Sequence, residues 1–189
     1  MIVIKEKDTV YFAYATGHHS YYTTLRFDDS EEENMSLWHL NDGKGTIVML
    51  DARSDRIADL LRYSDIFDLE LTVEALCGLR AQIVALYRGA NCREIDGCIG
   101  VVVFIARGSQ VFRVYGDGSV EEVESFVSGH YYEDAFSAAY EHCRAIEDPH
   151  ERIAAIYDMV EAHTGRRAEA VAVINTKDDS YTILPRKAG

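Results

Sequence analysis

Short apolar runs separated by polar turns open the chain. Residues 2–5 are apolar apart from Lys5, a charged turn follows, and residues 9–16 alternate aromatic and small side chains. Residues 35–40 and 46–50 are two further apolar runs, joined by a segment rich in asparagine, aspartate and glycine. Those residue types supply the left-handed conformations of a tight turn. The pattern therefore predicts two β-hairpins.

Apolar residues recur at a spacing of three to four in four later segments, which predicts helices. The strongest segment runs from Thr72, a residue type that caps helices, to Gly89, a residue type that ends them. The others cover residues 54–62, residues 135–140 and a segment that begins near Pro149. Amphipathic helices of this kind pack one face on a sheet.

Runs of β-branched and aromatic residues between the helices predict further strands. Residues 98–106 and 111–115 are almost continuously apolar, which is typical of strands covered on both faces. Residues 120–127 predict one more strand, and residues 170–174 and 181–184 predict a closing pair. Strands grouped between pairs of helices favour packed antiparallel sheets with helices outside over a parallel sheet.

The composition is that of an ordinary globular protein of one domain. The chain has 189 residues, 48% hydrophobic and 27% charged, and a formal charge of -13 that repels phosphate backbones and anionic lipids. We therefore expect no nucleic-acid or membrane partner. No stretch approaches the roughly 20 apolar residues of a membrane span and no signal layout opens the sequence, so we expect a cytoplasmic protein. The four cysteines form no CxxC pair and are interpreted as reduced.

Several pieces of the chain carry a family resemblance through their order and spacing. They are the opening hairpin with Val3-Ile4-Lys5, residues 37–42 followed by a strand and a helix at 58–62, the strand, Asp-Gly turn and strand at 111–120, and Ser128-Gly129 before a helix. Together they resemble the proteasome β-subunit and the peptidase of the related bacterial ATP-dependent protease, over nearly the whole chain. The resemblance implies one α+β domain over residues 1–189, a four-layer α/β/β/α sandwich of two stacked, mainly antiparallel sheets.

The resemblance also shows which catalytic groups are missing. In that family an amino-terminal threonine attacks a carbonyl and its own amine acts as the general base. Met1 falls at that position, and the bulky Ile2 is expected to protect it from removal. The family's orienting aspartate falls at Ala15 and its lysine falls near Ser36. A thioether cannot become a nucleophile, so the resemblance implies a catalytically degenerate relative.

Other polar residues are candidates for a site in the same cleft. Neutral imidazoles can bind a divalent metal or act as a base, but the histidines lack ligand spacing such as HxxxH, so we predict no metal and no cofactor. The serine-glycine pair serves a turn at a helix start more simply than it serves catalysis. The candidate cleft residues are His18, His19, His39, Ser128, Gly129 and His130.

Two functions follow from these observations. The first is a non-catalytic proteasome-like protein that binds an unknown ligand or assembles with itself through its helices. The alternative is a hydrolase, either a peptidase or an amidohydrolase, that uses a non-standard site in the same cleft, with His18, His39, Ser128 or His130 as its working groups. The two differ in whether any amide or ester is turned over.

Overall fold

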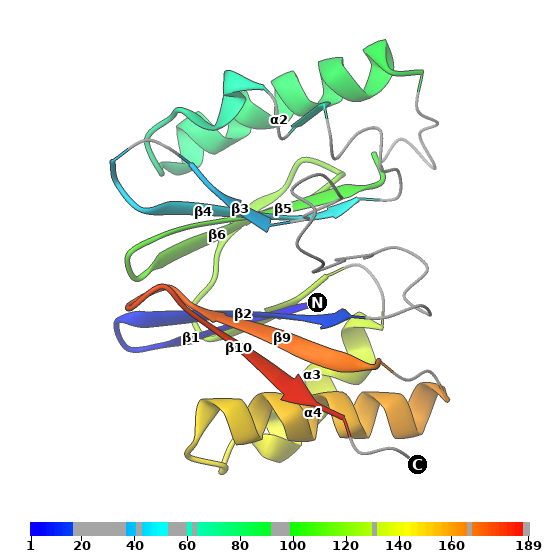
Figure 1. Ribbon diagram of the computed structural model, residues 1–189. Helices are drawn as coiled ribbons and strands as arrows, with labels where there is room; N and C mark the ends of the chain where they lie inside the picture. The colour runs from blue at the N-terminus through cyan, green and yellow to red at the C-terminus, as the bar shows by residue number, and fades with distance from the viewer. Residues whose placement is uncertain are drawn as a thin grey trace. The chain divides into compact units, whose positions relative to one another are not determined.

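The computed structural model describes residues 1–16, 37–40, 43–52, 60–61, 64–91, 99–129, 132–165 and 168–186, with the backbone alone at 37–39, 51–52 and 185. The chain divides into two compact units. The first unit comprises Met1–Arg26 and Glu124–Gly189, and the second comprises Phe27–Val123. Each unit contains one antiparallel sheet with helix packed on it (Figure 1).

The sheet of the first unit has five strands in the order β10-β9-β2-β1-β8. Every neighbouring pair is antiparallel, and the predicted opening hairpin is present, with Ile2 opposite Ala13. The predicted closing pair is present as well, and it joins the hairpin because Ala13 lies opposite Val173. The strands are β1 (Ile2–Glu6), β2 (Thr9–Thr16), β8 (Phe126–Ser128), β9 (Ala170–Asn175) and β10 (Ser180–Pro185).

Two helices, α3 (Glu133–Cys143) and α4 (Pro149–Thr164), cover one face of this sheet (Figure 1). Asp148 caps α4 by accepting a hydrogen bond from the Glu151 amide at 2.8 Å. We call the buried residues between sheet and helices the first core, and each aliphatic side chain in it stabilises the fold by about 1.5–3 kcal/mol. Its members are Ile2, Ile4, Ala13, Phe136, Ala139, Tyr140, Cys143, Ile153, Ile156, Tyr157, Val160, Val171 and Val173.

A buried arginine ties the turn between α3 and α4 to the sheet. Arg152 forms an ion pair with Glu6 at the end of β1, and its Nε donates to the Ile146 carbonyl at 2.7 Å. By contrast, Arg144 and Glu141 form an exposed pair on α3 at 3.6 Å, with side chains 68% and 66% exposed. Removing a buried partner costs far more than removing an exposed one.

The sheet of the second unit also has five antiparallel strands, in the order β3-β4-β5-β6-β7. The run at 101–106 is buried throughout, as its continuous apolar sequence predicts. The strands are β3 (Leu37–His39), β4 (Thr46–Ala52), β5 (Val101–Arg107), β6 (Gln110–Val114) and β7 (Val120–Glu122).

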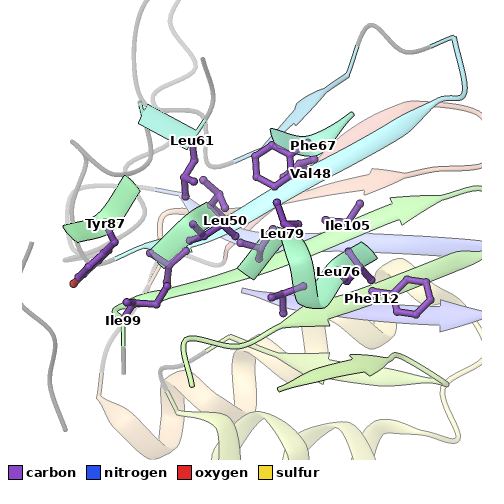
Figure 2. Close-up of a cluster of buried hydrophobic side chains, with 14 residues drawn as sticks. Val48, Leu50, Leu61, Phe67, Leu76, Leu79, Tyr87, Ile99, Ile105 and Phe112 are labelled. Atoms are coloured by element: carbon purple, nitrogen blue, oxygen red, sulfur yellow. The ribbon is translucent and has the colours of Figure 1, made fainter. Parts of the chain in front are cut away.

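Helix α2 (Val73–Gly89) packs on one face of this sheet, and the predicted cap is present because Thr72 Oγ1 accepts from the Ala75 amide at 3.2 Å. A short 3-10 helix, η1 (Asp65–Phe67), precedes it and was not predicted. We call the buried residues between α2 and this sheet the second core. Figure 2 shows Leu76 and Leu79 of α2 among strand residues such as Val48 and Ile105, and Tyr87 of α2 near Ile99. Of the helix predicted at 54–62, only residues 60 and 61 are described.

The turn between β6 and β7 depends on glycine. A Cβ built on Gly116 would lie 2.0 Å from the Ile99 carbonyl oxygen, so no side chain fits there. Gly118 has a φ of +102°, which L side chains rarely adopt. Asp117 Oδ1 accepts hydrogen bonds of 2.8 Å from both the amide and the hydroxyl of Ser119, and these bonds hold the pKa of Asp117 below its ordinary value.

The prediction of a single strand at 120–127 is wrong, because the segment divides into β7 and β8, which belong to different sheets. The Val123 amide still donates to the Val111 carbonyl in the second unit, at 2.9 Å. Two residues later the Ser125 carbonyl accepts from the Lys5 amide in the first unit, at 2.7 Å. No glycine, proline, asparagine or aspartate interrupts residues 120–127, so no turn signal in the sequence marked the change of sheet.

The expected fold class is confirmed: the protein is α+β, with two antiparallel sheets and helices packed on them. None of the helices among the described residues is long and apolar enough to span a membrane.

Candidate functional site

The start of β1 and the end of β8 meet at one corner of the first sheet. Ile2 lies opposite Ser128 in the register, and the Gly129 amide donates to the Met1 carbonyl at 3.1 Å. Met1 is half-buried, whereas Ser128 is only 1% exposed. The structure therefore brings together three of the predicted site residues, which we call the β1–β8 corner: Met1, Ser128 and Gly129.

The Ser128 hydroxyl lies on the helix-covered face of the sheet. Residues directly opposite each other in an antiparallel pair point to the same face, and Ile2 belongs to the first core. Phe126, two residues earlier, stacks on Tyr140 of α3 with ring centroids 4.3 Å apart. Among the residues that the structure describes, Ser128 Oγ has no hydrogen-bond partner. An unpartnered buried hydroxyl costs about 1–3 kcal/mol.

Ala15 lies on the same face but away from the corner. It pairs with Val171 of β9 and packs against the first core. Because Ile2 pairs with Ala13, the register places Ala15 two residues beyond that pair, and alternation puts its side chain on the face opposite to that of Met1. A carboxylate at this position would enter the apolar core beneath the helices.

Sequence reasoning missed Tyr14, which is 1% exposed. Alternation from the Ile2–Ala13 pair places Met1 and Tyr14 together on the face away from α3 and α4. Burial raises the pKa of the Tyr14 phenol, and the neighbouring Tyr181, to which it is hydrogen-bonded, raises it further. The phenol is therefore protonated at neutral pH. No sequence signal singled it out, because a tyrosine in an alternating strand is typical of core packing.

The chemistry available at the β1–β8 corner is limited. Nucleophilic catalysis needs a hydroxyl or thiol within hydrogen-bond reach of a base. The described residues at this corner offer a thioether, a protonated phenol on one face and a serine hydroxyl on the other. Among the described residues no base lies within hydrogen-bond reach of Ser128 Oγ, so none of them activates this hydroxyl.

The remaining predicted site residues give less information. His39 lies on β3, opposite Ile47, in the second unit, and its side chain is outside the description. Within the described residues no three histidine, cysteine, aspartate or glutamate side chains are placed to hold a metal ion. The predicted residues that lie outside the described ranges altogether are His18, His19, Ser36 and His130.

The second unit contains a buried arginine that sequence reasoning also missed. Arg113 on β6 is 2% exposed, and its guanidinium lies 3.6 Å from the centre of the Tyr115 ring. The Tyr115 hydroxyl donates to a carboxylate oxygen of Glu121 at 2.8 Å. A cation over an aromatic ring is stabilised by the negative face of the ring. Its sequence signal was a single charge within the apolar run at 111–115.

The two sheets, their strand orders and their helices define a class of fold. It is that of the proteasome-type N-terminal-nucleophile hydrolases, as the sequence resemblance implied. Three solved structures show this, each matching 92% of the chain. BPH of Thiobacillus denitrificans matches with a TM-score of 0.69 and 12% identity over 95% of its chain. Its complex with epoxomicin matches with a TM-score of 0.67 and 11% identity over 96%.

The third structure is eukaryotic HslV from Trypanosoma brucei, with a TM-score of 0.63 and 15% identity over 97% of its chain. Identities this low show the shared fold alone. No family model matches the sequence, and no curated protein matches it.

Proposed function

We propose that this protein is a non-catalytic proteasome-like protein that works as a binding or self-assembling subunit, with an unknown ligand. The observation that carries the proposal is the β1–β8 corner, where the residue before β1 is Met1 and not a residue with a hydroxyl or thiol. A thioether cannot be deprotonated, so it cannot attack a carbonyl.

The neighbourhood of Met1 supports the same proposal. Ala15, which we match to the family's aspartate, packs into an apolar core, and Ser128 directs its hydroxyl to the same face, away from Met1. We also match Ser36 to the family's lysine, a match that rests on sequence alone. Loss of the nucleophile, the aspartate and the lysine together favours a protein selected for something other than peptide hydrolysis.

Epoxomicin is the probe for this proposal, because BPH was solved in complex with it. The intact protein would be incubated with an excess of epoxomicin and weighed by mass spectrometry, with BPH as the positive control. We expect no added mass and no turnover of fluorogenic peptides. The same spectrum shows whether Met1 is retained. A stoichiometric adduct at the amino terminus would end the proposal.

One observation favours the alternative, a hydrolase with a non-standard site. The Ser128 hydroxyl is buried and has no partner among the described residues, which is a costly arrangement in a merely structural serine. A panel of amide and ester substrates, run with Ser128→Ala, His39→Ala and His130→Ala, tests it. Turnover that Ser128→Ala abolishes would support the hydrolase, and turnover by none of these proteins would leave it without support.

Self-association through the helices and a cytoplasmic location are also part of the proposal. Two large apolar side chains are exposed on the described helices α2, α3 and α4: Val73 at the start of α2, 53% exposed, and Met159 on α4, 38% exposed. A contact through a helix would cover one of these side chains, so both are positions at which helix association can be tested. Lysine at either position should weaken any oligomer that forms there, and sedimentation measures this.

A further inference from the structure

Strand β10 is the longest of the edge strands that the structure describes. It spans six residues, Ser180–Pro185, whereas the other three edge strands, β3, β7 and β8, span three residues each. Figure 1 shows it in red at one edge of its sheet, next to β9. No strand within the described ranges pairs with its other edge. That edge therefore presents main-chain N–H and C=O groups to a further strand.

The edge lacks the usual protection against strand pairing. Natural edge strands are kept short or carry charges, prolines or bulges. From Ser180 to Leu184 this strand has no charged residue and no proline, and it pairs with β9 without interruption. Tyr181 and Ile183, which point to one face, are 41% and 43% exposed. Such an edge is suited to take up another strand.

We infer that β10 is a self-association edge, at which two copies of this chain pair antiparallel about a two-fold axis at Thr182. This inference rests on the self-assembly part of the proposed function and assigns it to a strand instead of a helix. A two-fold axis perpendicular to the sheet keeps each side chain on its face, so the two strands form one continuous sheet. It places Tyr181 of each copy opposite Ile183 of the other, and aromatic–β-branched pairs stabilise antiparallel sheets.

The two ends of the strand fit this axis. Pro185 has no N–H and ends the ladder on one side. Asp179, on the other side, has a φ of 57°, in the left-handed region, so the extended strand begins after it. An axis at Thr182 sets Pro185 of one copy opposite Asp179 of the other. Both strands of the pair then end at the same place, and residues 180–184 pair in full.

Charge and size set the strength of the pairing. Each copy carries a formal charge of -13, so two copies repel over most of their surfaces, but the strand itself brings no charge to the contact. Five paired residues bury far less than the roughly 1,200–2,000 Å² of a stable interface. The dimer is therefore weak, and its detection needs high protein concentration.

Sedimentation of the full chain tests the inference, over a range from about 10 µM to about 1 mM. We expect a monomer–dimer equilibrium in the wild type. Ile183→Lys should weaken it at least about tenfold, because it removes both aromatic–β-branched pairs and adds two charges. The matched control Leu60→Lys adds the same charge at an apolar residue that is 38% exposed, and it should leave the dimer unchanged. The helix variants Val73→Lys and Met159→Lys are run beside it, because they test association through the helices. Circular dichroism verifies that each variant is folded.

A second variant tests the register independently. Thr182→Cys places two thiols opposite each other at the axis, so mild oxidation should give a dimer in which mass spectrometry finds residue 182 linked to itself. A dimer that is lost in the helix variants and kept in Ile183→Lys would overturn this inference and leave self-assembly through helices in place. A wild-type monomer throughout would overturn both, whereas the non-catalytic proposal is decided separately by the epoxomicin experiment.

Discussion

Replacing Ser128 by alanine should stabilise this protein, which is an unusual expectation for a residue 1% exposed. The substitution removes one oxygen that has no hydrogen-bond partner among the described residues and leaves the Cβ in place. An unpartnered buried hydroxyl costs about 1–3 kcal/mol, and its removal recovers this free energy. The small void that the oxygen leaves destabilises the variant and offsets part of the gain. We expect a net gain of about 1 kcal/mol, which raises the melting temperature by about 2–4 °C in a chain of this size.

A second serine provides a chemically identical control. Ser64 Oγ donates to the Leu61 carbonyl at 2.7 Å, so Ser64→Ala loses a hydrogen bond and should destabilise by about 0.5–1.5 kcal/mol. Urea unfolding of both variants, followed by circular dichroism, gives the two free-energy changes with opposite signs. If Ser128→Ala destabilises as much as Ser64→Ala does, the Ser128 hydroxyl has a partner, and the unpartnered hydroxyl that favours the hydrolase alternative disappears.

Three further substitutions, two of them compared with a control, test contacts elsewhere in the two units. Arg152→Met should cost about 2 kcal/mol in urea unfolding, because it breaks the ion pair with β1, whereas Arg144→Met, in an exposed pair, should cost under about 0.5 kcal/mol. Gly116→Ala should lower the melting temperature markedly because its Cβ meets a carbonyl oxygen at 2.0 Å, whereas Gly78→Ala, within α2 with nothing within 4 Å, should raise it. Asp117→Asn should lower the free energy of unfolding at pH 6. Its difference from the wild type should shrink as the pH falls below 3.8, because a lowered carboxyl pKa stabilises the fold only while the group is ionised. An equal difference at pH 6 and below pH 3.8 would contradict this.

Much of the secondary structure could be predicted from the sequence because local signals and packing agree there. Thr72 caps α2 through its side chain, and Asp148 with Pro149 begins α4, as their residue types favour. The opening hairpin follows from an apolar run and a series of aromatic and small residues on either side of a charged turn. In each case the residues that set the backbone conformation lie within a few positions of one another, so a reading of the chain in sequence detects them.

The candidate site was less predictable, because it depends on which face a residue occupies and which strand lies beside it. Ala15 was matched to a catalytic position by its place along β2, but only the register shows that it enters the first core. Tyr14 gave no signal although it lies on the same face as Met1. The change of sheet after Val123 was not predicted either, because no turn residue marks it in the sequence.

The first unit is assembled from the two ends of the chain. Met1–Arg26 pairs with strands that follow Glu124, and the whole of Phe27–Val123 lies between them in sequence. During synthesis the hairpin of β1 and β2 therefore cannot pair with β8 and β9 until those later strands have been made. The continuous second unit has all its strands much earlier. Contacts this distant in sequence slow folding and leave strand edges open to other chains meanwhile. The folding rate of this protein should accordingly be limited by closure of the first sheet. In a nascent chain halted before β9, the edge of β2 that pairs with β9 should stay exposed.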